Sequence, residues 1–305
     1  MRCRKCGVKA AINLPEHRLA LCKAHLLDWI PEQTERFIQK YDMFTHEDRI
    51  LVAVSGGKDS LALWDVLWRL GYNADGLYIN LGIDGGVEYS ARSLRCARQF
   101  ADARSLNLMV SDIPAERGVT IPELAMRSVR GKERPCAVCG IVKRHIMNQM
   151  TTESGYTVIA TGHNLDDEAA VLFGNTLVWD GEQIVRQSPV LPAKPGMARK
   201  VKPFCRFYER ETAAYTLMRG IEYEYDECPH ALGNRTNEIK TQLNQMEANK
   251  PGVKLTFYLS FLQAKENGLF QPQSTTAVDL HPCPTCGQPS VHEGNCTFCR
   301  LFENK

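Results

Sequence analysis

The sequence has no apolar run approaching the roughly 20 residues that a membrane-spanning helix needs. Residues 1–6, MRCRKC, are not followed by the apolar stretch that forms the core of an export signal. Net charge is also nearly absent, because 37 lysines and arginines face 35 aspartates and glutamates, which leaves +2. We therefore expect a cytoplasmic protein without membrane contact, and any nucleic-acid binding must use local basic patches.

Cysteine, in contrast, is abundant. The chain of 305 residues is 44% hydrophobic and 24% charged, as is usual for globular proteins, but it contains twelve cysteines. In a reducing compartment so many cysteines favour metal binding over disulfides. Nine of them fall into three sets by their spacing.

Two sets, one near each end of the chain, each contain two closely spaced pairs of ligands. They are Cys3, Cys6, Cys22 and His25, and Cys283, Cys286, Cys296 and Cys299. Two tight pairs of soft or borderline ligands are typical of a closed tetrahedral zinc site. Because four protein ligands leave no open position, we predict that both sites are structural or grip a partner.

The third set is internal and incomplete. Cys136 and Cys139 follow a basic run at 127–135, and no second pair lies nearby. A lone C-x-x-C fits half a zinc site, a redox dithiol or part of an iron–sulfur site. Cys228, Cys96 and Cys205 match no ligand spacing, and on sequence alone each is interpreted as a buried thiol.

The strongest local pattern lies at Ile50–Leu70, ILVAV-SGGKDS-LALWDVLWRL. The apolar run predicts a buried parallel strand, and apolar residues at three- and four-residue spacing predict a helix that Gly71 can end. A glycine turn that opens a helix presents free backbone N–H groups to an anion such as phosphate. The spacing differs from the G-x-x-x-x-G-K-[ST] loop of nucleoside triphosphatases.

Further strands alternate with helices, which predicts a doubly wound parallel sheet. Strands are expected at Ala74–Asn80, Leu106–Val110 and Thr157–Ala160, and helices at 24–41 (restarting at Pro31), 89–104, 235–247 and 257–265. Ligands of such sheets lie beyond the carboxyl ends of the strands, so Ala53 and Ile79 are candidates to flank an adenine, although both fit equally well as core residues.

The fourth strand leads into T-G-H-N-L-D-D-E at 161–168. Asn164 or Asp166 could cap the helix that follows, with acidic residues complementing its dipole. Alternatively, clustered carboxylates at the end of a parallel strand suit a Mg2+-bound nucleotide.

The chain resembles the TtcA/TtuA family of PP-loop ATP pyrophosphatases from Cys3 to about Arg300. The resemblance rests on S-G-G-K-D-S, T-G-H-N-L-D-D-E-A, the two terminal ligand sets and the central C-x-x-C. The resemblance implies an α/β fold with a doubly wound parallel sheet flanked by zinc modules. It also implies ATP, Mg2+, two Zn2+ and a [4Fe-4S] cluster as cofactors. The implied partners are tRNA, a ubiquitin-like sulfur carrier ending in a thiocarboxylate, and a second copy of the chain.

The resemblance also assigns site residues. The cluster ligands would be Cys136, Cys139 and Cys228, which leaves one iron open to carry sulfur, and the catalytic residues would be Lys143, Asp167 and Asp59. The nucleotide contacts would be Ala53, Ser55, Gly56, Gly57, Lys58, Asp59, Ser60, Ile79, Lys143, Gly162 and Asp167.

We therefore expect a zinc finger at 1–28, a PP-loop catalytic domain at 29–232, a helical segment with a linker at 233–280, and a zinc ribbon at 281–305. The expected enzyme adenylates the C2 oxygen of 5-methyluridine at position 54 in the tRNA T-loop and replaces it with sulfur. Two alternatives remain: thiolation of the wobble uridine at position 34, and a zinc-rich RNA-binding protein whose loop only senses ATP.

A basic stretch interleaved with aromatic residues is a candidate tRNA surface. It consists of Lys194, Arg199, Lys200, Lys202, Arg206 and Arg210, with Phe204, Phe207 and Tyr208 between them. Lysine and arginine would contact phosphates while a ring stacks on an unstacked base. The alternative is a solvated surface beside a proline-rich loop.

Overall fold

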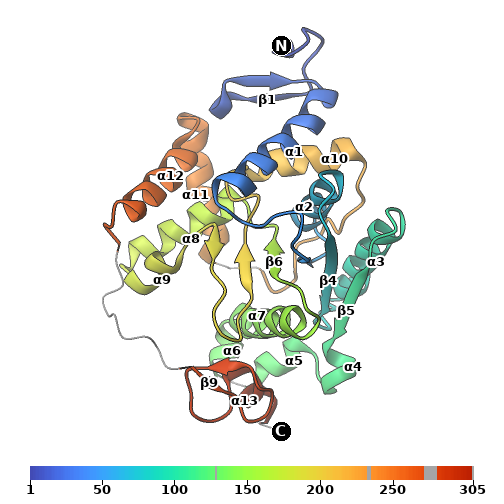
Figure 1. Cartoon of the computed structure of the whole chain (residues 1–305), viewed down its shortest axis with the longest axis vertical. Coiled ribbons are helices and arrows are strands. Elements are labelled where there is room, and N and C mark those ends of the chain that lie inside the picture. The colour runs from blue at the N-terminus through green and yellow to red at the C-terminus, as the bar shows by residue number, and fades with distance from the viewer. Residues whose placement is uncertain (128, 232–234, 271–279, 304–305) are drawn as a thin grey trace.

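The computed structural model describes residues 1–127, 129–231, 235–270 and 280–303. Its centre is a six-stranded sheet in the order β5-β4-β3-β6-β8-β7 (Figure 1). The strands are β3 (Ile50–Val54), β4 (Ala74–Asn80), β5 (Leu108–Asp112), β6 (Val158–Thr161), β7 (Val190–Leu191) and β8 (Arg199–Val201). Neighbouring strands from β5 to β8 are parallel, and only β7 pairs antiparallel. The predicted doubly wound fold is confirmed.

Both faces of the sheet are covered, which explains the unbroken apolar run of β3. Ile50, Val52 and Val54 belong to the main core beside α2 (Lys58–Arg69), whereas Leu51 faces the other way. Leu51 joins a cluster that includes Met147 of α7 (Pro135–Glu153). Because side chains alternate along a strand, a strand buried on both sides shows no polar positions.

Several predicted bounds differ from the structure: β6 lies one residue later than expected, and the helix expected at 257–265 begins at Val253. The strand expected at 106–110 begins two residues later, because the N–H of Leu106 bonds Ala101 O at the end of α3 (Tyr89–Asp102). Pro31 does not restart a helix either: α1 runs unbroken through it (Lys23–Lys40). Proline cannot donate to Leu27 O four residues earlier, and the Arg69 guanidinium donates to that oxygen instead.

The remaining helices surround the sheet and its carboxyl edge. They are α4 (Ile113–Arg117), α5 (Ile121–Met126), α6 (Val129–Glu133), α8 (Leu165–Leu177), α9 (Gly181–Arg186), α10 (Glu209–Arg219), α11 (Arg235–Asn249) and α12 (Val253–Glu266). No helix among the described residues is both long and apolar enough to span a bilayer.

Two small hairpins mark the ends of the molecule. β1 (Ile12–Leu14) and β2 (Leu19–Leu21), joined by the short helix η1 (Pro15–His17), lie at the N-terminal end. β9 (His281–Pro282) and β10 (Pro289–Ser290), followed by α13 (Thr297–Glu303), lie at the opposite end (Figure 1). The linker expected within 233–280, before the second ligand set, falls at 274–279, which lies outside the described residues.

Candidate active site and metal centres

The sheet reverses its winding between β3 and β6, and the loops that leave these strands lie against each other. A Cβ on Gly162, just after β6, would lie 2.9 Å from the backbone of Asp59 and Ser60. Only glycine permits so close an approach of the two loops. Ligands of doubly wound sheets bind at such a reversal, so the structure puts the S-G-G-K-D-S loop where a nucleotide is expected.

The loop is held open by its own hydrogen bonds. Ser60 Oγ accepts from the N–H of Ser55 at 3.1 Å and donates to Gly57 O at 3.0 Å. Gly56 has a φ of +78°, and a Cβ there would lie 2.3 Å from Ser93 O. No side chain caps the start of α2 at Gly57. The first N–H groups of α2 are therefore available to a phosphate.

An alternating chain of charges joins this loop to α8. Lys58 Nζ lies 3.0 Å from Asp59 and 2.6 Å from Glu209, and Lys240 Nζ lies 2.6 Å from Asp167 and 3.4 Å from Glu209. We call these five residues the charge network. It brings two predicted catalytic residues, Asp59 and Asp167, to one place.

The network sets the protonation of its members. Burial opposes the charge of Lys58, but Asp59 and Glu209 outweigh it and raise the pKa of Lys58. Burial likewise opposes ionisation of Asp167, but Lys240 and then His163 lower its pKa. Both side chains are therefore charged at neutral pH, Lys58 as a partner for phosphate and Asp167 as one for a cation.

Three residues at this site are not found by the motifs. Glu209 and Thr212 come from α10, and Thr212 donates to Asp59; Lys240 comes from α11. No local spacing marks them, since they reach the loop only through packing of α10 on α2 and of α11 on α8.

The three carboxylates that open α8 have different roles. Asn164 and Asp167 form a reciprocal capping box, which confirms the helix cap. Asp166 lies 2.5 Å from Lys254, and Glu168 lies 2.8 Å from Lys202, with both carboxylates buried. Asp167 is thus the carboxylate of the three that belongs to the charge network.

Both residues predicted to flank an adenine are partly open. Ala53 is the one residue of β3 that is not fully buried, and Ile79 is half-buried near the end of β4. Their place near the carboxyl edge suits the assignment, which stays a prediction.

The internal cysteines gather at the start of α7. Cys136 is exposed and its Sγ donates to His230 O at 3.5 Å, while Cys139 and Cys228 are half-buried in one apolar cluster. Burial raises the pKa of Cys139. The positive charge of Lys143 acts in the opposite direction, and the neighbouring Cys228 and Cys136 raise the pKa further. Lys143 therefore lies beside these thiols, one helical turn after Cys139.

One segment connects the nucleotide loop with these thiols. The N–H of Glu224 donates to Gly56 O at 2.9 Å, and Arg92 holds the Glu224 carboxylate at 2.7 Å. Cys228 follows four residues later, and Pro229 fills the space that a Cβ on Gly85 would need. The loop and the internal cysteines are therefore neighbours along one short stretch of backbone.

The two terminal sets have the geometry of single-ion sites. In each set the four ligand atoms lie within 4.8 Å of one another, with Sγ–Sγ distances of 3.8 Å for Cys6 and Cys22 and 3.7 Å for Cys283 and Cys299. Thiolates about 2.3 Å from a tetrahedral ion would be about 3.8 Å apart. Burial favours the neutral thiols of Cys3 and Cys283, but hydrogen bonds from backbone N–H groups outweigh it and lower the pKa of both. The thiolate form, which binds metal, is therefore favoured.

The internal set is different. Cys136, Cys139 and Cys228 are not among the groups of described residues whose ligand atoms fall within 4.8 Å of one another. Their wider spacing suits a multi-iron cluster, in which each thiolate binds its own iron, better than a single ion. Of the unassigned cysteines, Cys205 is buried as predicted and Cys96 only partly.

The basic and aromatic stretch is not the predicted base-stacking surface. Phe204, Phe207 and Tyr208 are at most 2% exposed and belong to the main core. Three of its cations also have acidic partners: Lys202 pairs with Glu168, Arg210 with Glu16, and Arg199 with Asp42. The prediction was wrong because these rings are packed between elements far apart in sequence.

Comparison with known proteins agrees with this geometry. Residues 2–27 match the model for the N-terminal LIM domain of 2-thiouridine synthetase TtuA, and residues 30–247 match the PP-loop domain. A tRNA-5-methyluridine(54) 2-sulfurtransferase of Thermus thermophilus is 50% identical over 99% of this chain and 91% of its own. One from Pyrococcus horikoshii is 38% identical over 99% and 94%.

A solved structure shows the same fold. It is the U34-tRNA thiolase NcsA from Methanococcus maripaludis with its [4Fe-4S] cluster, which superposes with a TM-score of 0.80 at 22% identity, covering 100% of this chain and 96% of that one. From the nucleotide loop, the cysteine sets and these matches together, the chain belongs to the TtuA family of tRNA-thiolating PP-loop enzymes.

Proposed function

We propose that this protein is an ATP-dependent tRNA sulfurtransferase that converts 5-methyluridine at position 54 of the T-loop into its 2-thio form. One observation carries the proposal: the backbone from Glu224 to Cys228 joins the phosphate-binding loop to three thiols. Activation of an oxygen by ATP and delivery of sulfur to the same carbon need both groups at one base. The relatives named for position 54 are 36% to 50% identical to this chain, against 22% for the U34-tRNA thiolase NcsA from Methanococcus maripaludis, which favours position 54 over 34.

In this proposal the nucleotide binds across the two loops. The serines, glycines and Lys58 of 55–60 hold the pyrophosphate half of ATP at the start of α2. Asp59, Glu209 and Asp167 offer carboxylates to Mg2+, which usually takes one or two of them together with phosphate oxygens. Ala53, Ile79 and Gly162 contact the adenosine half.

The chain's own residues would then prepare the uridine. Lys58 and Lys240 neutralise charge that develops as pyrophosphate leaves, and Lys143 and Asp167 position the adenylated base. Cys136, Cys139 and Cys228 would hold a [4Fe-4S] cluster, which would supply an iron without a protein ligand where sulfur can be carried. The sulfur would come from a ubiquitin-like carrier with a thiocarboxylate, and the active form would be a cytoplasmic homodimer.

The two terminal sets would each hold one Zn2+ without taking part in the chemistry. We also propose the four-part division of the chain: a finger at 1–28, the catalytic domain at 29–232, a helical segment at 233–280 and a ribbon at 281–305. The extra helices α11 and α12 would serve the catalytic domain, since α11 supplies Lys240.

Replacing one thiol tests the proposal. Cys228→Ala should abolish thiolation of tRNA while ATP binding stays nearly intact, and Cys96→Ala is the matched control because that thiol belongs to no ligand set. The assay uses protein prepared without oxygen, nucleoside mapping of the product tRNA, and iron, acid-labile sulfide and zinc per chain. Normal thiolation by Cys228→Ala would refute the cluster assignment. Pyrophosphate release that is stimulated by tRNA would argue against the ATP-sensing alternative, and its absence would refute the activity.

A further inference from the structure

The segment that brings Cys228 to the internal thiols has no helix or strand of its own. Residues 221–228 follow α10 as irregular backbone. The N–H of Glu224 donates to Gly56 O at 2.9 Å, which fixes one point of the segment on the nucleotide loop. Irregular backbone takes its shape from the rigid elements that it contacts, so the position of Cys228 depends on what else holds this segment.

One arginine of α3 holds the segment from the side. The guanidinium of Arg92 lies 2.7 Å from the carboxylate of Glu224 and 2.8 Å from that of Asp226. The side chain of Glu224 is only 3% exposed, and its carboxylate also accepts the N–H of Asp226 at 3.0 Å. A buried carboxylate needs such partners, because burial without them is costly. Arg92 therefore closes the turn at 224–226, two residues before Cys228.

The same part of α3 contacts the nucleotide loop. Ser93 is buried, and its carbonyl oxygen would lie 2.3 Å from a Cβ on Gly56. The hydroxyl of Tyr78 in β4 donates to Ser90 O at 2.8 Å and lies 2.7 Å from Ser93 Oγ, which fixes this turn of the helix to the sheet. The first turns of α3 therefore reach the nucleotide loop as well as the segment that ends at Cys228.

The loop before α3 meets the segment on the other side of Cys228. Gly85 has a φ of +63°, and a Cβ there would lie 2.2 Å from Pro229. Residues 85–93 thus contact the segment both before Cys228, through Arg92, and directly after it. Neither contact involves a thiol itself, so this part of the chain acts on the position of Cys228 and not on its chemistry.

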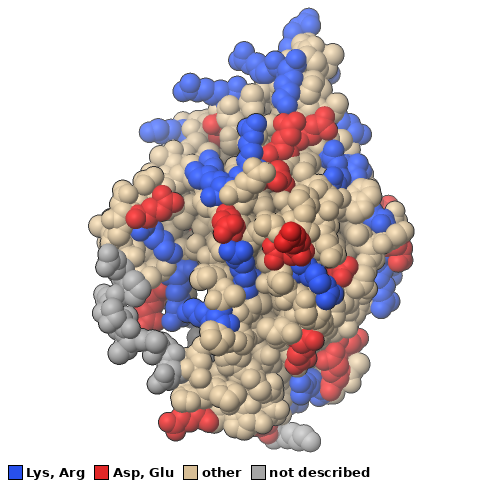
Figure 2. Space-filling model, viewed as in Figure 1, with Lys and Arg blue, Asp and Glu red and all other residues tan. Residues whose placement is uncertain are grey.

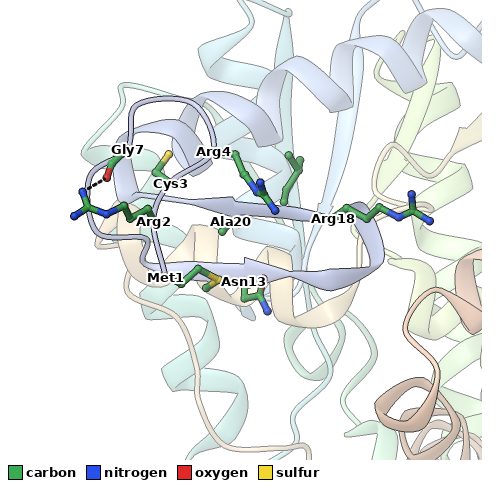
Figure 3. Close-up of a pocket in the computed structure, with 9 residues that line it drawn as sticks. Met1, Arg2, Cys3, Arg4, Gly7, Asn13, Arg18 and Ala20 are labelled. Atoms are coloured by element: carbon green, nitrogen blue, oxygen red, sulfur yellow. Dashed lines mark hydrogen bonds between the residues drawn. The ribbon is translucent and has the colours of Figure 1, made fainter.

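Arg92 differs from the cations that dominate the surface. Residues 1–27 contain six lysines and arginines against one acidic residue, and Figure 2 shows this charge at the end of the molecule where Figure 1 places the N-terminus. Figure 3 shows three exposed members of this set around a hollow, Arg2, Arg4 and Arg18. Arg92 instead is half-buried between two carboxylates, so its charge is used within the fold.

We propose that Arg92 is a positioning residue that couples the nucleotide loop to the internal thiols. By holding the carboxylate of Glu224, it keeps the N–H of Glu224 on Gly56 O and keeps Cys228 beside Cys139. A nucleotide on the loop and a cluster on the thiols then order the same segment, so each lowers the entropic cost of binding the other. The inference rests on the proposed function and extends it, because it names the residue through which the two sites act together.

The test compares Arg92→Gln with Arg95→Gln, which removes an exposed cation about one turn later in the same helix. Affinity for ATP is measured on full-length protein with its iron–sulfur cluster and after loss of the cluster in air, with the thiols reduced again and the zinc content unchanged. The unchanged protein and Arg95→Gln should bind ATP at least about 5-fold more tightly with the cluster than without it. In Arg92→Gln this ratio should fall to within about twofold of one.

The ratio separates coupling from a general loss of stability, which would weaken ATP binding in both forms and leave the ratio unchanged. Coupling is reciprocal, so ATP should also slow the loss of iron to a ferrous chelator, followed by the visible absorbance of the cluster. This protection should disappear in Arg92→Gln and persist in Arg95→Gln. Arg92→Lys keeps the charge but loses the paired donors, and it should recover part of both effects.

Three results would overturn the inference: a ratio near one in the unchanged protein, an unchanged ratio in Arg92→Gln, or an equal fall in Arg95→Gln. Each of them leaves the proposed function standing if the unchanged protein still thiolates tRNA. If the unchanged protein, prepared without oxygen, contains no iron or binds no ATP, the proposed function falls and the inference falls with it.

Discussion

The two terminal fingers share a ligation pattern but differ in everything around it. The N-terminal finger is basic and packs Leu14 and Leu21 into the main core, whereas residues 281–303 contain one basic residue, Arg300, against Glu293 and Glu303. The C-terminal finger docks on α7 by an aromatic contact: Phe298 is 2% exposed and its ring stacks on His145 at 3.8 Å. Two fingers with the same metal-ligand pattern can therefore differ, one carrying exposed positive charge and the other packing on α7.

The braced helix matters because of what it carries. α7 also holds Cys136, Cys139 and Lys143, and Asn148 of α7 donates to Gln288 of the second finger. The first finger contacts the opposite side of the site: His17 lies 2.9 Å from Glu211 of α10, two residues after Glu209. The second finger thus packs on α7, which carries two of the internal cysteines, and the first finger contacts α10, which carries Glu209.

Removing one ligand from each finger should separate the two roles most strongly. Cys3→Ala and Cys299→Ala should each lower the metal content by about one ion per chain, since three ligands do not close a tetrahedral site. Cys3→Ala should weaken tRNA binding and preserve ATP binding, whereas Cys299→Ala should abolish thiolation and keep tRNA affinity within about threefold. Metal analysis, tRNA binding and nucleoside mapping measure these effects. Identical phenotypes would contradict the division of roles.

Phe298→Ala should show how firmly the second finger is docked. Removing a buried phenylalanine costs about 3 to 5 kcal/mol of unfolding free energy, through lost apolar burial and the cavity left behind. Denaturant unfolding measures the loss. Val291→Ala, at a position that is 60% exposed in the same finger, is the control and should change stability by less than about 0.5 kcal/mol. A small loss in Phe298→Ala would mean that the finger is only loosely attached.

The same contact should make the second finger sensitive to acid. Burial, and then Arg117, lower the pKa of His145 from 6.5 to about 4, and its Nε2 is buried without a hydrogen-bond partner among the described residues. Between these values the unfolded chain binds a proton that the folded protein does not. Stability is therefore fully present above about pH 6.5 and falls toward pH 4, by about 1 to 2 kcal/mol after allowance for partial exposure.

The variant His145→Phe keeps a ring for stacking and cannot titrate. The slope of unfolding free energy against pH between 4 and 6.5 should flatten in this variant. An unchanged slope would show that another group is responsible for the acid sensitivity.

The smallest effect is expected at the exposed pair of Lys5 and Glu32. Their side chains are 40% and 52% exposed and the ion pair spans 3.5 Å, so water and salt screen most of the attraction. Glu32→Gln should change the unfolding free energy by less than about 0.5 kcal/mol, as measured by urea titration. A larger loss would mean that the first finger, too, is held mainly by a specific contact to α1.

Features that depend on neighbouring residues were predicted correctly from the sequence, whereas features that depend on distant residues were not. The bounds of β3 and β4 were predicted without error, because apolar runs and glycine turns follow from neighbouring residues. The grouping of each terminal set into one possible metal site was also predicted, since two ligands with only two residues between them lie in one tight turn. Phe204, Phe207 and Tyr208 were misread because sequence does not show whether an aromatic ring beside cations faces water or the core.

The sequence by itself determined the loop chemistry, the cysteine spacing and the excess of positive charge before residue 28, because each depends on residue types a few positions apart. Only the tertiary structure decided that Glu209 and Lys240 join Asp59 to Asp167, that Arg69 compensates for Pro31, and that the two fingers dock differently. These contacts join residues 31 to 194 positions apart along the chain or depend on which side chains are buried. Their partners are chosen by packing around the sheet, which leaves no trace in local spacing.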